Sequence, residues 1–267
     1  MSSGSLTVVG TGIRLGTHLT RETRLLLETA DVVLSLVAEP GMQAVLERLN
    51  PKTRSLHDLY ELGESRAEAY EAMAEEILRH VREGKNVVAA FYGHPGVFVN
   101  PSHEAVRRAR AEGFSARMLP AVSAEDCLYA DLGVDPCAAG LQSFEATDLV
   151  LRLRAVDVSA ALILWQVGVV GNVDYAPHGD VSRLPLLVEH LLRFYAREHR
   201  VVLYEASLYP VCGPLIEELP LADLATAEVS PMTTLFVPPA VRPPVDPVSR
   251  ARLGLQAPAA AGAAARA

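Results

Sequence analysis

Residues 86–102, NVVAAFYGHPGVFVNPS, decide how the fold is interpreted. The apolar run at residues 86–90 predicts a buried strand, and it ends in a turn built on Gly93, Pro95 and Gly96. Pro95 fixes one φ angle, whereas the glycines permit backbone conformations that other residues resist. In open α/β sheets, ligands bind beyond the carboxyl ends of the strands. The stretch therefore predicts a ligand-binding loop, with a tight strand–helix connection that holds no ligand as the alternative.

Strand and helix patterns alternate on both sides of this stretch. Before it, strands are predicted at residues 6–9 and 31–37. The helix between these two strands is predicted to have Thr20 as its N-cap, and a second helix at about 42–49 follows the strand at 31–37. After it, a helix is predicted from Ser102, with Gly113 just past its end. Such alternation indicates parallel pairing and a doubly wound sheet.

The pattern restarts near residues 118–122, where we place a domain boundary. A chain of 267 residues, 50% of them hydrophobic, suits two medium α/β domains. We predict domains at residues 1–118 and 119–240 and a flexible Pro/Ala-rich tail at 241–267. The second domain carries predicted strands at 161–167, 200–204 and 234–237, with a helix at about 184–198.

Composition excludes several classes of protein. The net charge of −8 and the lack of a dense Lys/Arg run argue against a nucleic-acid partner. The cysteines Cys127, Cys137 and Cys212 lack metal-binding spacing and cannot all pair, so we expect no metal and a reducing cytoplasm. We find neither a signal peptide nor an apolar run of membrane-spanning length.

The first predicted strand ends in Gly10-Thr11-Gly12, which resembles a nucleotide-binding fingerprint only superficially. Gly16 falls one residue away from the third glycine of G-x-G-x-x-G, and no acidic residue follows at a strand end about twenty positions on. A dinucleotide-binding Rossmann domain is therefore not expected. The glycines are better explained by a close approach of the loop to a ligand or to a neighbouring strand.

A long helix is predicted after Ser65. Ser65 and Glu68 have the spacing of a capping box, and Gly84 follows the last helical residue. The apolar stripe of this helix contains Tyr70, and the position one turn earlier on the same face is Arg66.

Arg66 is unexpected at this position. A cation in the first turn opposes the helix dipole, and an inward-facing charge is costly unless an anion meets it. Tyr60 lies in the preceding loop, so Tyr60, Arg66 and Tyr70 are candidates for one polar pocket. The alternative is that Arg66 extends to solvent along its aliphatic stem, while Tyr70 is an ordinary core residue.

Taken together, several segments resemble the borosin family, which are peptide backbone α-N-methyltransferases on the tetrapyrrole-methylase fold. The resemblance rests on residues 4–12, 60–70, 91–102, 118–128, 164–168 and 235–239, and so covers about residues 4–240. It implies an α/β, two-domain, class III methyltransferase fold, with a parallel sheet in the N-terminal domain and a mixed sheet in the C-terminal domain. It also implies a homodimer.

The resemblance assigns catalytic roles to the Arg66 set. Arg66 matches the residue that meets negative charge on the amide oxygen, Tyr70 one that takes or shares the amide proton, and Tyr60 one that hydrogen-bonds the same amide. The amide nitrogen is a poor nucleophile because its lone pair is delocalised. A phenol with a pKa of about 10 is a weak base toward it, so positioning and charge stabilisation must supply most of the catalysis.

The resemblance also implies an S-adenosyl-L-methionine pocket, with S-adenosyl-L-homocysteine as the product. His94 has a simpler alternative, in which it only braces the loop. Glu205 departs from the apolar residue expected at its place, and would either bond a cofactor hydroxyl or point to solvent. The positions that match the pocket are Tyr92, His94, Val97, Phe98, Ser123, Ala124, Gln166, Tyr204, Glu205, Ala206, Ser207, Thr233 and Thr234.

The segment after Pro239 departs from the fused borosins, which continue through a helical clasp into the peptide that they methylate. Residues 241–267 are too few for a clasp and lack the β-branched run typical of substrates. The chain therefore resembles the split type, which implies a separate precursor peptide with a leader domain, in a 2:2 complex.

Two other functions are compatible with the sequence. The fold alone would allow a small-molecule methyltransferase that acts on a tetrapyrrole-type ring, because fold does not fix function. A catalytically inactive peptide-binding scaffold is the second. The combination of Tyr60, Arg66 and Tyr70 argues against both.

Overall fold

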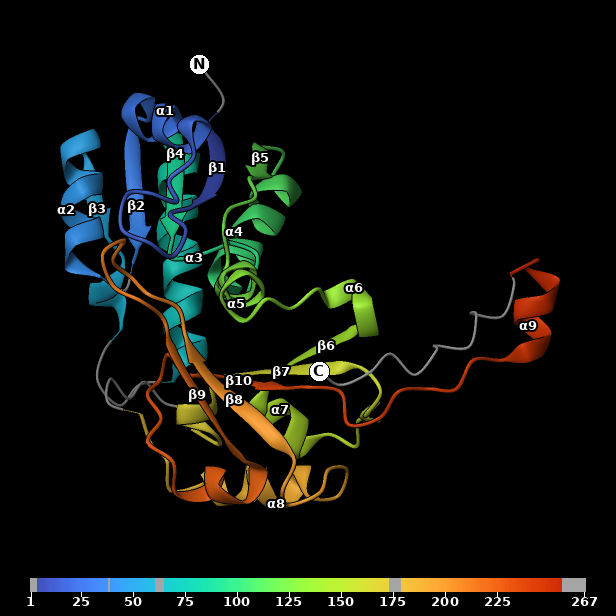
Figure 1. The fold of residues 1–267 in the computed structure, drawn as a ribbon. Helices are drawn as coiled ribbons and strands as arrows, with labels where there is room; N and C mark the ends of the chain where they lie inside the picture. The colour runs from blue at the N-terminus through green and yellow to red at the C-terminus, as the bar shows by residue number, and fades with distance from the viewer. Residues whose placement is uncertain (1–3, 38, 61–64, 173–178, 256–267) are drawn as a thin grey trace.

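The computed structural model describes residues 4–37, 39–60, 65–172 and 179–255. Within these residues, the first half of the chain forms a five-stranded parallel sheet of order β3-β2-β4-β1-β5 (Figure 1). Gly10 and Leu36 both pair with Phe91, so β1, β2 and β4 end at the same level. The strands are β1 (Ser5–Gly10), β2 (Val32–Leu36), β3 (Thr53–Ser55), β4 (Asn86–Phe91) and β5 (Ser115–Met118).

Helices cover both faces of this sheet, as the alternating pattern predicts. On one face, α1 (Arg21–Thr29) and α2 (Pro40–Leu49) pack Leu27 and Leu46 against Val9 and Val88. On the other, α3 (Arg66–Arg82) and α4 (Asn100–Ala111) pack against alternate residues of the same strands. Successive strand residues point to opposite faces, so a sheet buried on both sides reads as a continuous apolar run.

The helix boundaries largely follow the predictions. Thr20 caps α1, and its hydroxyl accepts a hydrogen bond from Thr23 N at 3.1 Å. The helix predicted from Ser102 begins two residues earlier, at Asn100, because the buried Ser102 hydroxyl instead donates to Val99 O at 2.7 Å. Gly113 adopts a left-handed conformation just past the end of α4, as predicted.

The capping box predicted at Ser65 is wrong. Ser65 caps α3, but its hydroxyl accepts from Ala67 N at 3.2 Å, and no reciprocal bond from Glu68 is present among the described residues. The complete capping box of the described chain joins Ser123 and Asp126. A serine followed by a carboxylate three residues later therefore identified a helix start here, but not its bonding.

The second half forms a five-stranded mixed sheet within the described residues, of order β6-β7-β10-β8-β9. β6 and β7 are parallel, whereas the β7–β10, β10–β8 and β8–β9 pairs are antiparallel, which confirms the expected mixed sheet. The strands are β6 (Leu141–Glu145), β7 (Ala161–Trp165), β8 (Arg200–Glu205), β9 (Leu215–Pro220) and β10 (Thr234–Val237).

Helices of this half are short. The helices α5 (Ala124–Leu132) and α6 (Pro136–Ala139) precede the sheet, and α7 (Ala146–Leu151) follows β6. The helix predicted at 184–198 is shorter, because α8 (Leu184–Leu191) gives way to turns that bury Tyr195 in the core.

The carboxyl edge of the first sheet faces the second sheet (Figure 1). The loops that leave this edge carry Ile13 and Tyr92, which pack in one cluster with Trp165 and Tyr204 of the second sheet. The opposite face of the second sheet is covered by α7 and α8. The predicted domain boundary lies in the connection between the two sheets and stays a prediction.

Most of the segment after β10 belongs to the predicted tail at residues 241–267, whose flexibility stays a prediction. It contains a short helix, α9 (Pro247–Arg252), which Asp246 caps and which lies away from both sheets in Figure 1. Residues 256–267 lie outside the described residues. In the part of the chain that the structure describes, no helix has the length and apolar character needed to cross a membrane.

Candidate functional site

Two strained residues mark the edge where the sheets meet. Among the described residues, Phe98 (φ 57°) and Gln166 (φ 60°) are the non-glycine residues with positive φ. They follow β4 and β7, and the Phe98 ring lies 5.5 Å from the Trp165 ring, centroid to centroid. The strand predicted to reach residue 167 ends at Trp165 because Gln166 leaves the extended conformation. Such strain gathers at functional sites.

The loop after β4 is held by its own hydrogen bonds. His94 Nδ1 accepts from Gly96 N at 2.9 Å, and Val97 N donates to His94 O at 3.1 Å. Gly93 and Gly12 exchange two backbone bonds, at 3.1 and 3.2 Å. His94 thus braces the loop through Nδ1, which is the simpler of its two predicted roles.

Gly10 explains the glycine-rich turn after β1. A Cβ at Gly10 would lie 2.1 Å from Gly93 O and 2.5 Å from the Ala121 side chain. The glycine therefore permits a close approach to the loop after the neighbouring strand β4, whereas the sequence predicted an approach to a ligand or to a neighbouring strand itself.

An apolar wall contains four of the predicted cofactor residues. Tyr92, Ala124, Tyr204 and Ala206 all belong to the cluster between the sheets. Tyr92 also lines a small pocket at the carboxyl edge of the first sheet. Burial raises the pKa of Tyr92, so its phenol stays neutral.

The Tyr204 hydroxyl already has a hydrogen-bond partner within the protein. It donates to Asp131 Oδ2 on α5 at 2.7 Å, and the whole side chain is buried. Burial, together with this bond, raises the pKa of Tyr204. Tyr204 therefore contributes packing to the wall, and its hydroxyl is occupied by Asp131.

The hydroxyl groups of Ser123 and Ser207 are also engaged. Ser123 Oγ donates to Asp126 Oδ2 at 2.8 Å, and Ser207 Oγ donates to Tyr209 O at 2.8 Å. Thr233 and Thr234 are buried where β10 begins. Their backbones form part of this edge of the second sheet.

Glu205 does not simply point to solvent. Its Oε1 accepts hydrogen bonds from Ser230 Oγ at 2.6 Å and from Thr233 Oγ1 at 2.5 Å. Ser230 was not singled out from the sequence. The carboxylate joins the end of β8 to the turn before β10.

The Tyr60, Arg66 and Tyr70 set lies at the start of α3. The Tyr60 and Tyr70 rings meet edge to face, with centroids 6.1 Å apart, and Arg66 lies one turn before Tyr70 on the same helix face. Arg66 is half-buried, and within the described residues its guanidinium has no hydrogen bond or ion pair. The structure thus brings the two tyrosines together and places Arg66 on the same helix face as Tyr70, with no anionic partner in the part of the chain that the structure describes.

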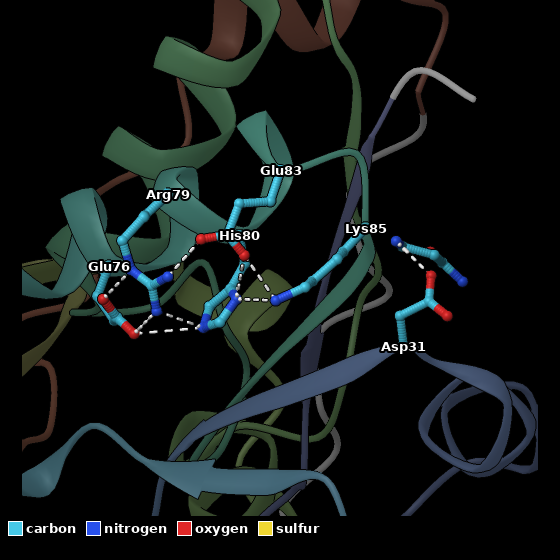
Figure 2. Close-up of polar contacts among 7 residues, drawn as sticks. Asp31, Glu76, Arg79, His80, Glu83 and Lys85 are labelled. Carbon is cyan, nitrogen blue, oxygen red and sulfur yellow. Dashed lines mark hydrogen bonds and ion pairs between the residues drawn. The ribbon is translucent and has the colours of Figure 1, made fainter. Parts of the chain in front are cut away.

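A second cluster of charged residues lies at the far end of α3, at the opposite edge of the sheet (Figure 2). His80 is buried there, with Arg79 Nη2 2.9 Å and Lys85 Nζ 3.0 Å from its ring nitrogens. Burial lowers the pKa of His80, and these two cations lower it further. Glu76 and Glu83 balance the cations, so the cluster is an ion-pair network that joins α3 to β4.

Trp165, Asp131 and Ser230 are the neighbours of the predicted site residues that sequence reasoning missed. Trp165 had a signal, because it is the single tryptophan and directly precedes Gln166 at a strand end. Asp131 and Ser230 had none, since their partners are distant in the sequence.

Comparison with known proteins gives a consistent family. A family model described as Tetrapyrrole (Corrin/Porphyrin) Methylases matches residues 5–210. Among solved structures, a uroporphyrin-III-C-methyltransferase from Thermus thermophilus superposes with a TM-score of 0.64 at 23% identity, covering 88% of this chain and 92% of that one. A cobalt precorrin-4 methyltransferase gives a TM-score of 0.63 at 16% identity, covering 88% and 94%. These structures confirm the expected class III methyltransferase fold.

Curated relatives are more similar in sequence. A methyltransferase/ribosomally synthesized cyclic peptide gymnopeptides precursor from Gymnopus fusipes is 43% identical over 89% of this chain and 58% of its own length. A type I borosin cyclic peptide precursor from Coprinopsis marcescibilis is 41% identical, over 89% of this chain and 62% of its own length. The chain thus spans about three fifths of the length of these relatives, which are named as methyltransferase and precursor together.

Proposed function

Because the chain belongs to the tetrapyrrole (corrin/porphyrin) methylase family, we propose that it methylates backbone amide nitrogens of a ribosomally made peptide. The observation that carries this proposal is that Arg66, half-buried and without a hydrogen-bond or ion-pair partner among the described residues, lies one helical turn before Tyr70, whose ring meets that of Tyr60. The relatives named as cyclic-peptide precursors support the same substrate class.

The residues where the loops of the first sheet meet the edge of the second fit S-adenosyl-L-methionine. The aromatic rings of Tyr92, Phe98 and Trp165 suit a sulfonium cation. The Glu205 carboxylate adds a negatively charged hydrogen-bond acceptor. A related uroporphyrin-III methyltransferase has been solved with S-adenosyl homocysteine, at a TM-score of 0.60. When bound, S-adenosyl-L-methionine supplies an electrophilic methyl group, and S-adenosyl-L-homocysteine is its product.

Three side chains make an amide nitrogen reactive in this proposal. Arg66 stabilises the negative charge that gathers on the amide oxygen as the nitrogen loses its proton. Tyr70 takes or shares that proton, and Tyr60 hydrogen-bonds the same amide and fixes its orientation. Among the described residues, no carboxylate pairs with the Arg66 guanidinium, which leaves it available for this charge.

The precursor forms the finer part of the proposal. We propose a separate precursor peptide with a leader domain, bound by a homodimeric enzyme in a 2:2 complex in the cytoplasm. The curated relatives carry enzyme and precursor in one chain, so the separate arrangement is tested by methyl transfer between two molecules.

The test is mass spectrometry of candidate substrates after incubation with S-adenosyl-L-methionine. Fragment ions that place added methyl groups on backbone nitrogens of a peptide supplied in trans would support the proposal. Methylation of a uroporphyrinogen-type ring, with peptides unchanged, would favour the family's ring chemistry instead. Cofactor binding without transfer to any substrate would favour the inactive scaffold.

A further inference from the structure

The turn before β10 is tied to the end of β8 by one carboxylate. Glu205 Oε1 accepts from Ser230 Oγ and from Thr233 Oγ1, at 2.6 and 2.5 Å. Thr233 lies across the sheet from Glu205, because Thr234 pairs with Tyr204 in the antiparallel register. Thr233 N closes the turn by donating to Ser230 O at 3.1 Å. The carboxylate therefore holds this turn against β8.

Both hydroxyl groups of the turn are fully used. Thr233 Oγ1 accepts from Ser230 N at 2.8 Å, and Ser230 Oγ accepts from Met232 N at 3.0 Å. Each hydroxyl has one proton, and each gives it to Glu205. Neither hydroxyl is left to donate to a ligand, so among the side chains of Glu205, Ser230 and Thr233 the group available to a ligand is the carboxylate acceptor.

The second oxygen of that carboxylate is available. Within the described residues, Glu205 Oε2 has no hydrogen-bond partner, and the side chain is half-buried rather than enclosed. The loop after β7 lies against the same turn, since a Cβ at Gly168 would lie 2.1 Å from Ser230 O. Gln166, with its strained backbone, precedes Gly168 by two residues. The free oxygen thus stands where β8, β10 and the strained loop converge.

We propose that Glu205 is a specificity residue of the cofactor pocket. Its Oε1 positions the turn at residues 230–233, and its Oε2 accepts a hydrogen bond from a donor on the adenosyl group, either the adenine amino group or a ribose hydroxyl. This inference rests on the proposed S-adenosyl-L-methionine-dependent function. An apolar residue here would leave the Ser230 and Thr233 hydroxyls without their acceptor.

Glu205→Gln separates the two roles. The glutamine carbonyl oxygen can still accept from both turn hydroxyls, but the outer atom becomes an amide donor that faces the ligand's donor. We expect thermal stability close to wild type and S-adenosyl-L-homocysteine binding weakened about ten- to hundredfold, as for the loss of a hydrogen bond to a charged group. Isothermal titration calorimetry measures the affinity without requiring turnover.

Two further variants calibrate the result. Glu205→Leu should lower both thermal stability and affinity, because it also releases the turn. Glu217→Gln, on the exposed face of the neighbouring strand β9, should change neither. Retained stability in Glu205→Gln but not in Glu205→Leu is the rescue expected of a positioning carboxylate.

Cofactor analogues identify the donor. If it is the adenine amino group, wild type should discriminate against S-inosylhomocysteine, and Glu205→Gln should reduce or reverse that preference. If it is a ribose hydroxyl, wild type should bind the corresponding deoxy analogue more weakly than S-adenosyl-L-homocysteine. Glu205→Gln should bind the two with similar affinity.

The inference fails if Glu205→Gln binds S-adenosyl-L-homocysteine as tightly as wild type, or if both proteins rank all the analogues alike. A wild-type protein that does not bind S-adenosyl-L-homocysteine at all would instead overturn the proposed function. The two failures are therefore distinguishable.

Discussion

Replacing Arg66 by alanine should separate catalysis from folding and from cofactor binding. The guanidinium forms no ion pair within the described residues, so the substitution breaks no ion pair among them. Arg66 is the first residue of α3, where a cation opposes the helix dipole. We therefore expect the free energy of unfolding to stay within about 1 kcal/mol of wild type, with any change toward greater stability.

The expected loss is in the rate of methyl transfer. Removing one fixed partner of a developing oxyanion typically lowers kcat by about a hundred- to a thousandfold, or about 3 to 4 kcal/mol of transition-state stabilisation. Peptide mass spectrometry measures the rate, while calorimetry with S-adenosyl-L-homocysteine on the same preparation should give an unchanged affinity.

Arg21→Ala is a matched control. Arg21 is also an arginine at the first position of a helix, but it is exposed on α1, far along the chain from the tyrosine pair. It reproduces the change in helix charge and should leave turnover unaltered. Near wild-type turnover in Arg66→Ala would refute the role assigned to this guanidinium, as would an equal loss in Arg21→Ala.

Four further outcomes are expected. Gly10→Ala should lower the free energy of unfolding, measured by denaturant titration, by about 3 kcal/mol because the new Cβ meets Gly93 O. The control Gly213→Ala should leave it nearly unchanged, since no atom lies within 4 Å of the Cβ added there. The pKa of His80 in the folded protein lies below its unfolded value of 6.5, so below that pH the unfolded chain binds more protons than the folded one. The free energy of unfolding should therefore fall as the pH drops through 6.5. His80→Gln should flatten this pH dependence in urea titrations. Light scattering should find a homodimer, and a uniform species at the monomer mass of 28.7 kDa, unchanged by precursor, would contradict it. A bare core peptide should be methylated far more slowly than an intact precursor with its leader, because docking replaces a covalent tether; equal rates would count against the separate-precursor arrangement.

The predictable part of the fold is the part with strong local patterns. The buried strands β1, β4 and β10 were located from their apolar runs, and the helices around them from their caps. The edge strands β3, β5, β6 and β9 were not predicted. β3 spans three residues, and β9 is exposed along most of its length, so neither carries the alternation that identifies a half-buried strand.

The hydrogen-bond partners of the site residues were harder to predict from the sequence than their places in strands and helices. Sequence placed Tyr204 at the end of a strand, but its bond to Asp131 joins residues 73 positions apart. The hydroxyl of Ser123 likewise depends on its capping partner. Tertiary contacts decide which hydrogen-bond donors stay available to a ligand. These contacts cannot be derived from the pattern of residues along the chain.

The two left-handed residues show what the resemblance added and what it left open. A bulky residue at positive φ costs about 1–3 kcal/mol, and glycine or asparagine is the usual choice there. Nothing in the local sequence predicts such a backbone at Phe98 or Gln166, yet both positions had been assigned to the cofactor pocket by resemblance alone. Glycine would relieve the strain but would remove the Phe98 ring from Trp165 and the Gln166 amide from the strand end. Because the chain carries a side chain at both left-handed positions where glycine would relieve the strain, we infer that these side chains contribute to the function of the two loops. One comes from each sheet, so the presentation depends on the packing of the first sheet's edge against the second.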